Sequence, residues 1–278
     1  MPILTMMRSP RISPLFVAAS LLVLLLVPAA AGAALSWITP EFALSAGDLQ
    51  DMTSSLPPEI ARGILARPQD FLHLMTKVLD QPAALFVLVD KRHSLPAEYV
   101  PPDLVPLKNY PVRTTWPNLL LRKSIMPAVM DMVHAARKQG VTITFSSTYR
   151  SFEYQRGVYE REVKMYGKEG ADRESALPGM SQHQLGTAID FGTISDGYEK
   201  TREGAWVAEH AWEYGFTLSY PPGLEDVTGY RYESWHYRYV SRPGALMQRE
   251  FFGDVQQYFL EFLDANRATL EQLRMKTD

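Results

Sequence analysis

The sequence contains no cysteine. This absence excludes disulfide bonds, cysteine-ligated zinc, iron–sulfur clusters, thiol catalysis and the lipid-modified cysteine of a bacterial lipoprotein. Any bound metal must therefore be held by histidine, aspartate or glutamate. A basic excess is also missing, because 28 Lys and Arg stand against 31 Asp and Glu, which gives a net charge of −3. Without surplus cations to neutralise phosphates, we expect no nucleic-acid partner.

The composition that remains is that of an ordinary globular protein. The chain has 278 residues, of which 46% are hydrophobic and 21% are charged. This is long enough for one or two domains and for a sizeable core. Helix-like and strand-like segments are mixed without a regular βαβ rhythm, and no internal repeat is present. The pattern favours an α+β fold.

A long apolar run occurs only at the N-terminus. Two arginines precede an apolar stretch over residues 15–27, and small residues with a cleavage site after Ala33 follow. We interpret residues 1–33 as a signal peptide or a membrane anchor. The short apolar core favours cleavage, whereas the run continued through Leu35 is long enough for an uncleaved anchor. Either way the positive-inside rule predicts export, to the periplasm or the outer face of the cytoplasmic membrane.

The rest of the chain divides into three predicted parts. Residues 34–80 are expected to be a polar linker, over 36–56, followed by a helical extension. Residues 81–242 form the main domain, and 243–278 form a C-terminal helical tail. Helices are expected over 59–66, 69–79, 121–139, 151–165, 202–214 and 254–275, and strands over 84–89, 141–147, 187–191, 217–220 and 230–239. Pro127 either kinks its helix or marks a later start.

Three segments concentrate His, Asp, Glu and Arg. They are Ser147-Thr148-Tyr149-Arg150 with Gln155, Ser181-Gln182-His183 with Asp190, and Glu233-Ser234-Trp235-His236. Two histidines and an aspartate are the composition of a catalytic zinc site that leaves a fourth position open. Taken singly, Asp190 is as easily a turn residue, Glu233 a surface charge and Arg150 an ion-pair partner. Glu233 and His236 would face opposite sides of a regular strand, so we predict irregular backbone there.

Together these segments resemble the VanY-type D-alanyl-D-alanine carboxypeptidases of the M15 zinc metallopeptidases, in the group with lysostaphin-like enzymes and hedgehog domains. The motifs are SxYRSxxxQ, SxHxxGxAxD and ExWH, and the resemblance runs over residues 87–240. It implies a small, mostly antiparallel central sheet with flanking helices that carry the zinc site. The segments 36–80 and beyond Arg242 fall outside it.

The resemblance also assigns roles to residues. It implies that His183, Asp190 and His236 hold one Zn²⁺ ion and that Glu233 is the general base. Arg150 would stabilise the oxyanion or bind the substrate carboxylate. Weaker substrate contacts are expected from Ser147, Gln155 and Ser181, while Tyr149, Trp235 and Tyr237 either wall the groove or pack in the core.

The implied activity is zinc-dependent removal of the C-terminal D-amino acid from peptidoglycan stem peptides. Two alternatives use the same chemistry on another bond, an L,D-carboxypeptidase and a peptidoglycan endopeptidase. A third is a non-catalytic zinc domain that binds wall peptides, against which Glu233 and Arg150 argue. The sequence specifies no oligomeric state, and membrane attachment would occur through the N-terminal segment.

Overall fold

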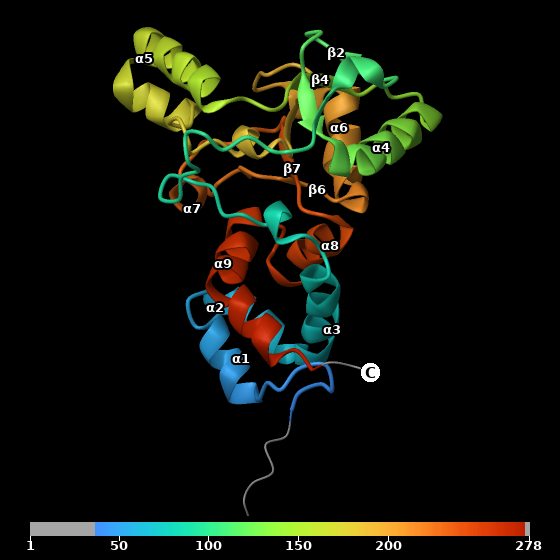
Figure 1. Ribbon diagram of the computed structural model, residues 1–278, viewed down its shortest axis with the longest axis vertical. Coiled ribbons are helices and arrows are strands. Elements are labelled where there is room, and N and C mark those ends of the chain that lie inside the picture. The colour runs from blue at the N-terminus through green and yellow to red at the C-terminus, as the bar shows by residue number, and fades with distance from the viewer. Residues whose placement is uncertain (1–36, 276–278) are drawn as a thin grey trace, which may run out of the picture. The chain divides into compact units, whose positions relative to one another are not determined.

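A five-stranded sheet organises the computed structural model, which describes residues 37–275 (Figure 1). Only the β2–β4 pair is parallel, and a separate antiparallel pair joins β1 to β3. The predicted α+β fold with a small, mostly antiparallel sheet is confirmed. Across the sheet the strands are β2 (Arg113–Thr114), β4 (Thr144–Ser147), β5 (Ala188–Phe191), β7 (His236–Tyr239) and β6 (Phe216–Leu218), and the separate pair is β1 (Leu104–Pro106) and β3 (Leu120–Arg122).

The register of the sheet aligns predicted site residues. Asp190 on β5 lies opposite His236 on β7 and, on its other side, opposite Ser147 on β4. A 3₁₀ helix, Gln182–Leu185, leads into β5 and ends at Gly186, whose φ of 68° is left-handed. A side chain at Gly186 would meet three neighbouring side chains within 3.2 Å, so glycine suits both the conformation and the space.

Helices flank the sheet on both sides. In Figure 1, α5 (Phe152–Glu174) projects on the side away from α4 (Met126–Lys138) and α6 (Arg202–His210), and the short α7 (Glu225–Thr228) lies below α5. Helix α4 starts later than 121 because Pro127 occupies its first turn. Helix α5 runs past the predicted end at 165, and Gly167 (φ 71°, ψ 173°) interrupts its helical geometry.

The strand predicted over residues 84–89 is wrong. The structure has a 3₁₀ turn, Ala83–Leu85, followed by irregular backbone. Its carbonyl groups are not paired with a strand, because the guanidinium of Arg238 donates to the oxygens of Leu85 (3.0 Å) and Val87 (2.8 Å). Arg238 is fully buried, and burial lowers its pKa to about 10. The residues of this segment are therefore apolar because they are buried, and not because they form a strand.

A helical layer is built from both ends of the described chain (Figure 1). Its helices are α1 (Ala46–Thr53), α2 (Pro58–Ala66), α3 (Pro68–Leu79), α8 (Arg242–Phe251) and α9 (Gln256–Leu273). Helix α1 lies within the stretch predicted as a linker, where Ser45 and Asp48 form a reciprocal capping box. The Ala43 N–H donates to the carbonyl of Leu273 at 2.8 Å, so the two ends are joined.

Aromatic side chains form the core of this layer. Phe71 on α3 packs edge-on against Phe251 and Phe262, with ring centroids 5.3 and 5.7 Å apart. Phe86 meets Phe259 in the same way at 5.8 Å, which links the layer to the segment that Arg238 holds. The extension and the tail therefore share one core.

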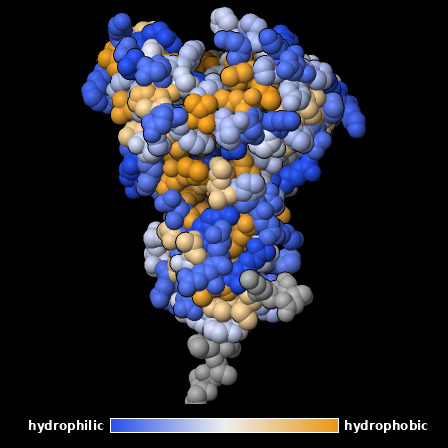
Figure 2. Space-filling model, in the orientation of Figure 1, coloured by the Kyte–Doolittle hydropathy of each residue, from blue (hydrophilic) through white to orange (hydrophobic). Residues whose placement is uncertain are grey.

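On the face shown in Figure 2, hydrophilic residues dominate the surface of the helical layer, and apolar residues gather above it.

No described helix is both long and apolar enough to cross a membrane. The predicted export segment, residues 1–33, lies outside the described residues.

Shortening Phe262 tests the shared core. Phe262 is 2% exposed, so Phe262→Ala is expected to lower the free energy of unfolding by about 3–5 kcal/mol. Urea unfolding is followed by circular dichroism and by the fluorescence of the buried Trp206 and Trp235, and both transitions should shift together. Leu246→Ala on α8, at a site 37% exposed, is the control and should cost less than about 1 kcal/mol. A fluorescence transition that stays at the wild-type urea concentration would show that the layer unfolds separately.

Candidate metal centre

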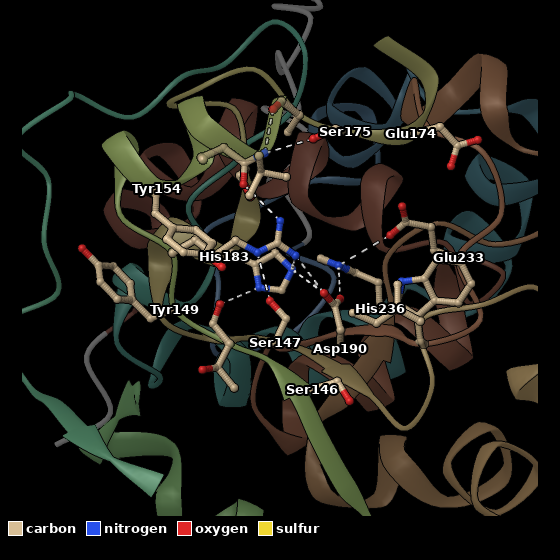
Figure 3. A pocket seen from close by; sticks show the side chains of 18 of the residues that line it. Ser146, Ser147, Tyr149, Tyr154, Glu174, Ser175, His183, Asp190, Glu233 and His236 are labelled. Atoms are coloured by element: carbon tan, nitrogen blue, oxygen red, sulfur yellow. Dashed lines mark hydrogen bonds and ion pairs between the residues drawn. The ribbon is translucent and has the colours of Figure 1, made fainter. Parts of the chain in front are cut away.

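Three buried side chains converge from three elements (Figure 3). His183 belongs to the 3₁₀ helix before β5, Asp190 lies on β5, and His236 is the first residue of β7. One ligand atom from each lies within 4.8 Å of the others. Within residues 37–275 this is the one group of three or more His, Asp or Glu side chains that are close enough together to hold a metal ion. The structure thus brings together the three residues that the sequence predicts as ligands.

The hydrogen bonds of His183 leave one of its ring nitrogens free for a metal. Its Nδ1 lies 2.7 Å from the carbonyl oxygen of Thr148, which only accepts, so Nδ1 carries the proton. The lone pair of Nε2 then faces Asp190 Oδ2 at 3.2 Å. On the other side of the carboxylate, His236 Nδ1 lies 2.9 Å from Oδ1. Ring nitrogens this close to carboxylate oxygens need a cation or a proton between them.

Arg150 supplies positive charge at this point. Its Nη2 lies 2.8 Å from Asp190 Oδ2 and 2.9 Å from His183 Nε2. The guanidinium is held from behind, because Nε donates to Ser147 Oγ at 2.9 Å and Nη1 donates to Gln155 Oε1 at 3.1 Å. Two imidazoles and a carboxylate around a cation are a donor set that suits Zn²⁺, so the residues fit that metal.

Burial and charge set the protonation of the cluster. Burial and the Arg150 guanidinium lower the pKa of His183 to about 4, which keeps its imidazole neutral. Burial acts to raise the pKa of Asp190, but its contacts with His183 and His236 hold that pKa well below the usual range. The cluster therefore presents a neutral imidazole and an ionised carboxylate at neutral pH, the forms that bind metals.

Glu233 lies beside the cluster without being part of it. Its Oε2 is 3.7 Å from His236 Nδ1, and the side chain is 12% exposed. Residues 233–235 form a turn before β7, which confirms the prediction of irregular backbone. Burial, and next the charge of Asp190, raise the pKa of Glu233 to about 8. This carboxyl group is thus poised to hold or release a proton near neutral pH.

A cleft of about 740 Å³ opens over the cluster. The remaining predicted contacts Ser181, Tyr149 and Trp235 line it, together with Ser147 and Gln155. The oxygens of the last two, Ser147 Oγ and Gln155 Oε1, already accept hydrogen bonds from Arg150, so their first role in this structure is to hold that side chain. Tyr237 does not line the cleft, because it packs on Phe191 in the core, with ring centroids 5.8 Å apart.

Sequence reasoning missed part of the cleft wall. Four residues of α5 at spacings of four line one side, namely Tyr154, Val158, Glu162 and Tyr166. That spacing is the signal that could have found them, since it puts all four on one helix face. Thr148 and Gln182 lie within the predicted site segments, but sequence reasoning gave them no role, and in the structure they position His183 and His236. Sequence reasoning missed Tyr220, whose ring lies 4.8 Å from that of His236.

Comparison with known proteins gives the family. The profile of the VanY family, described as D-alanyl-D-alanine carboxypeptidase, matches residues 118–242. A putative carboxypeptidase of Bacillus subtilis, YodJ, is 34% identical over 190 residues, which cover 66% of this chain and 70% of that protein. The chain therefore belongs to the VanY family of D-alanyl-D-alanine carboxypeptidases, among the M15-type zinc peptidases, and is an enzyme of that class.

Two solved structures are similar over the same part of the chain. The LD-carboxypeptidase LdcB shares 33% sequence identity at a TM-score of 0.57, covering 63% of this chain and 84% of that chain. A variant of the vancomycin-resistance D,D-pentapeptidase VanY from a VanB-type cassette, solved in complex with Zn(II), shares 30% identity at a TM-score of 0.54. That match covers 64% of this chain and 99% of the other.

The raised pKa of Glu233 predicts a pH-dependent stability of the metal-free protein. The unfolded carboxyl titrates near 4.5 and the folded one near 8, so between these values only the folded state keeps the proton. Stability is full below the lower pKa and is lost as the pH rises through the higher one. From pH 7 to 8.5 the chelator-treated protein should lose about 1 kcal/mol of unfolding free energy.

Urea unfolding at both pH values measures this loss, and Glu233→Gln is the matched variant. The variant has no carboxyl group to titrate, so its stability should change less over the same range. Equal changes in the two proteins would mean that Glu233 is already ionised in the folded state.

Proposed function

We propose that this chain is a zinc-dependent D,D-carboxypeptidase that removes the C-terminal D-amino acid from peptidoglycan stem peptides. The observation that carries the proposal is the His183–Asp190–His236 cluster with Glu233 and Arg150 beside it in one cleft. Membership of the VanY family and the Zn(II) complex of the similar VanY structure support it. A module that only binds wall peptides would need neither an ionisable carboxyl group nor a cation at the metal cluster.

His183, Asp190 and His236 are proposed to hold one zinc ion. When bound, zinc supplies Lewis acidity, which polarises a peptide carbonyl and acidifies water. Asp190 is ionised and His183 is neutral, so neither has to lose a proton to bind. Each imidazole is also oriented from behind, by the Thr148 carbonyl and by Gln182.

Glu233 is proposed as the general base. A base must take a proton from the attacking water and return it to the leaving amine, which needs a pKa near the working pH. Burial gives Glu233 a pKa of about 8, and a cation at the adjacent cluster would favour its ionised form. Its position 3.7 Å from His236 Nδ1 places it beside the proposed ligand atoms.

Arg150 is proposed to stabilise the oxyanion. Its Nη2 is within 3 Å of two proposed ligand side chains, His183 and Asp190. A metal bound to these ligands would displace Nη2 from them and leave the guanidinium beside the metal, where charge develops on the carbonyl oxygen. Ser147 and Gln155 fix the other two nitrogens of the guanidinium. This fixed orientation supports the oxyanion role over a mobile clamp on the substrate carboxylate.

An L,D-carboxypeptidase is the second candidate, because the LD-carboxypeptidase LdcB is among the similar structures. Both activities use the same cluster and differ in the bond presented to it. We also propose that residues 1–33 direct export and that the enzyme acts in the periplasm or on the outer face of the membrane, where the wall substrate lies.

Synthetic stems distinguish the two activities. The zinc-loaded protein is incubated with a pentapeptide and a tetrapeptide stem, and the products are weighed by mass spectrometry beside a Glu233→Ala control. Loss of one D-Ala from the pentapeptide alone is expected, with no product from the control. Loss from the tetrapeptide would move the assignment to L,D. No cleavage of either stem by folded, zinc-bound protein would contradict both activities.

A conservative change at Arg150 separates its two roles. Arg150→Lys keeps the charge but loses the planar donor pair, so kcat on the cleaved stem should fall about 10²–10³-fold with little change in KM. Steady-state kinetics measure both constants. A rise in KM at unchanged kcat would instead assign Arg150 to the substrate carboxylate.

A further inference from the structure

Buried amide side chains connect helix α9 to the metal cluster. Gln256, the first residue of α9, is 1% exposed, and Gln182, next to His183, is 3% exposed. Gln182 Nε2 donates to Gln256 Oε1 at 3.0 Å. Gln182 Oε1 lies 3.3 Å from His236 Nε2, on the side of the ring away from Asp190. The C-terminal tail thus reaches a proposed metal ligand through a single intervening side chain.

The direction of this series of hydrogen bonds is set where it begins, at Thr217. Gln256 Nε2 lies 3.3 Å from the carbonyl oxygen of Thr217 and 2.8 Å from its hydroxyl oxygen. A carbonyl only accepts, so the nitrogen of Gln256 must face Thr217 and its oxygen must face Gln182. Gln182 in turn presents its nitrogen to Gln256 and its oxygen to His236. Ser219 Oγ donates to the same Gln182 oxygen at 2.8 Å.

This order fixes which nitrogen of His236 keeps its proton when a metal binds. An oxygen facing Nε2 accepts a hydrogen bond from it, so Nε2 carries a proton. Nδ1 faces the carboxylate of Asp190 at 2.9 Å and shares a proton with it in this structure, so Nδ1 is the nitrogen that can exchange its proton for a metal. If the amide of Gln182 turned around, its NH₂ group would face Nε2 and force the proton onto Nδ1. That tautomer has no lone pair to offer the metal.

We propose that Gln256 is a positioning residue that keeps His236 Nδ1 available to the metal by orienting Gln182. The inference rests on the metal site of the proposed function. It assigns a role to the C-terminal tail, which lies outside residues 118–242 that match the family. Gln256 acts through Gln182 and touches neither metal nor substrate in this scheme.

Zinc affinity of the metal-free protein, measured by competition with a chromophoric chelator, tests the proposal without using peptidase activity. Gln256→Met keeps the length of the side chain but removes its hydrogen bonds, and it should weaken zinc binding about tenfold. Gln257→Met is the matched control. Gln257 is also buried on α9 and donates to Asp90 at 2.7 Å, away from His236, so zinc affinity should stay at the wild-type value.

A rescue experiment separates orientation from mere packing. A carboxylate accepts a hydrogen bond whichever way it turns, so in the Gln182→Glu background His236 needs no help from Gln256. Gln256→Met should therefore lower zinc affinity about tenfold beside the native Gln182 and should not lower it in the Gln182→Glu background. An equal loss in both backgrounds would overturn the proposal and leave Gln256 with a packing role.

Two further outcomes have distinct meanings. Thermal unfolding checks that each variant is folded. If Gln256→Met does not fold, Gln182→Met is used instead, because it removes the acceptor of His236 Nε2 directly. Gln182→Met should weaken zinc binding at least as much as Gln256→Met. Unchanged affinity in the folded variant would overturn this inference alone. A wild-type protein that binds no zinc would overturn the metal site of the proposed function and this inference with it.

Discussion

The site depends on one buried negative charge. Asp190 is 2% exposed, and its two oxygens face ring nitrogens of His183 and His236 at 3.2 and 2.9 Å. A carboxylate removed from water in this way is stable only beside a cation or strong donors. Arg150 meets that requirement in this structure, and a divalent metal would meet it better. The need for positive charge at this point makes the cluster a candidate metal centre and also holds Arg150 beside it.

The rest of the fold holds this charge in place. Antiparallel pairing of β5 with β7 puts Asp190 opposite His236, so the backbone ladder sets their separation. The helical layer packs beneath the sheet and joins the beginning and the end of the described chain. Through Gln256 the same layer contacts the side chain that orients His236. The tail is therefore part of the support of the site, although the family profile stops before α9.

The sequence predicted the residues of the cluster because they lie in short motifs with fixed spacing. It predicted poorly wherever the partner is distant. Gln182 and Gln256 are 74 positions apart, and no local pattern links them. Residues 36–56 look like a polar linker, yet Phe42 is fully buried and pairs with Arg274 near the other end. The strand expected over 84–89 was lost because Arg238, more than 150 positions away, takes its carbonyl groups.

The central claim is that the buried charge of Asp190, between two imidazoles, needs a cation beside it. Arg150 is that cation in this structure, and a zinc ion can take its place. A crystal structure of the zinc-soaked protein with anomalous diffraction at the zinc edge tests it most directly. The account predicts one anomalous peak bonded to His183 Nε2, Asp190 and His236 Nδ1, with Arg150 Nη2 no longer bridging His183 and Asp190. A peak elsewhere, or none while Arg150 keeps its bridge, would contradict it.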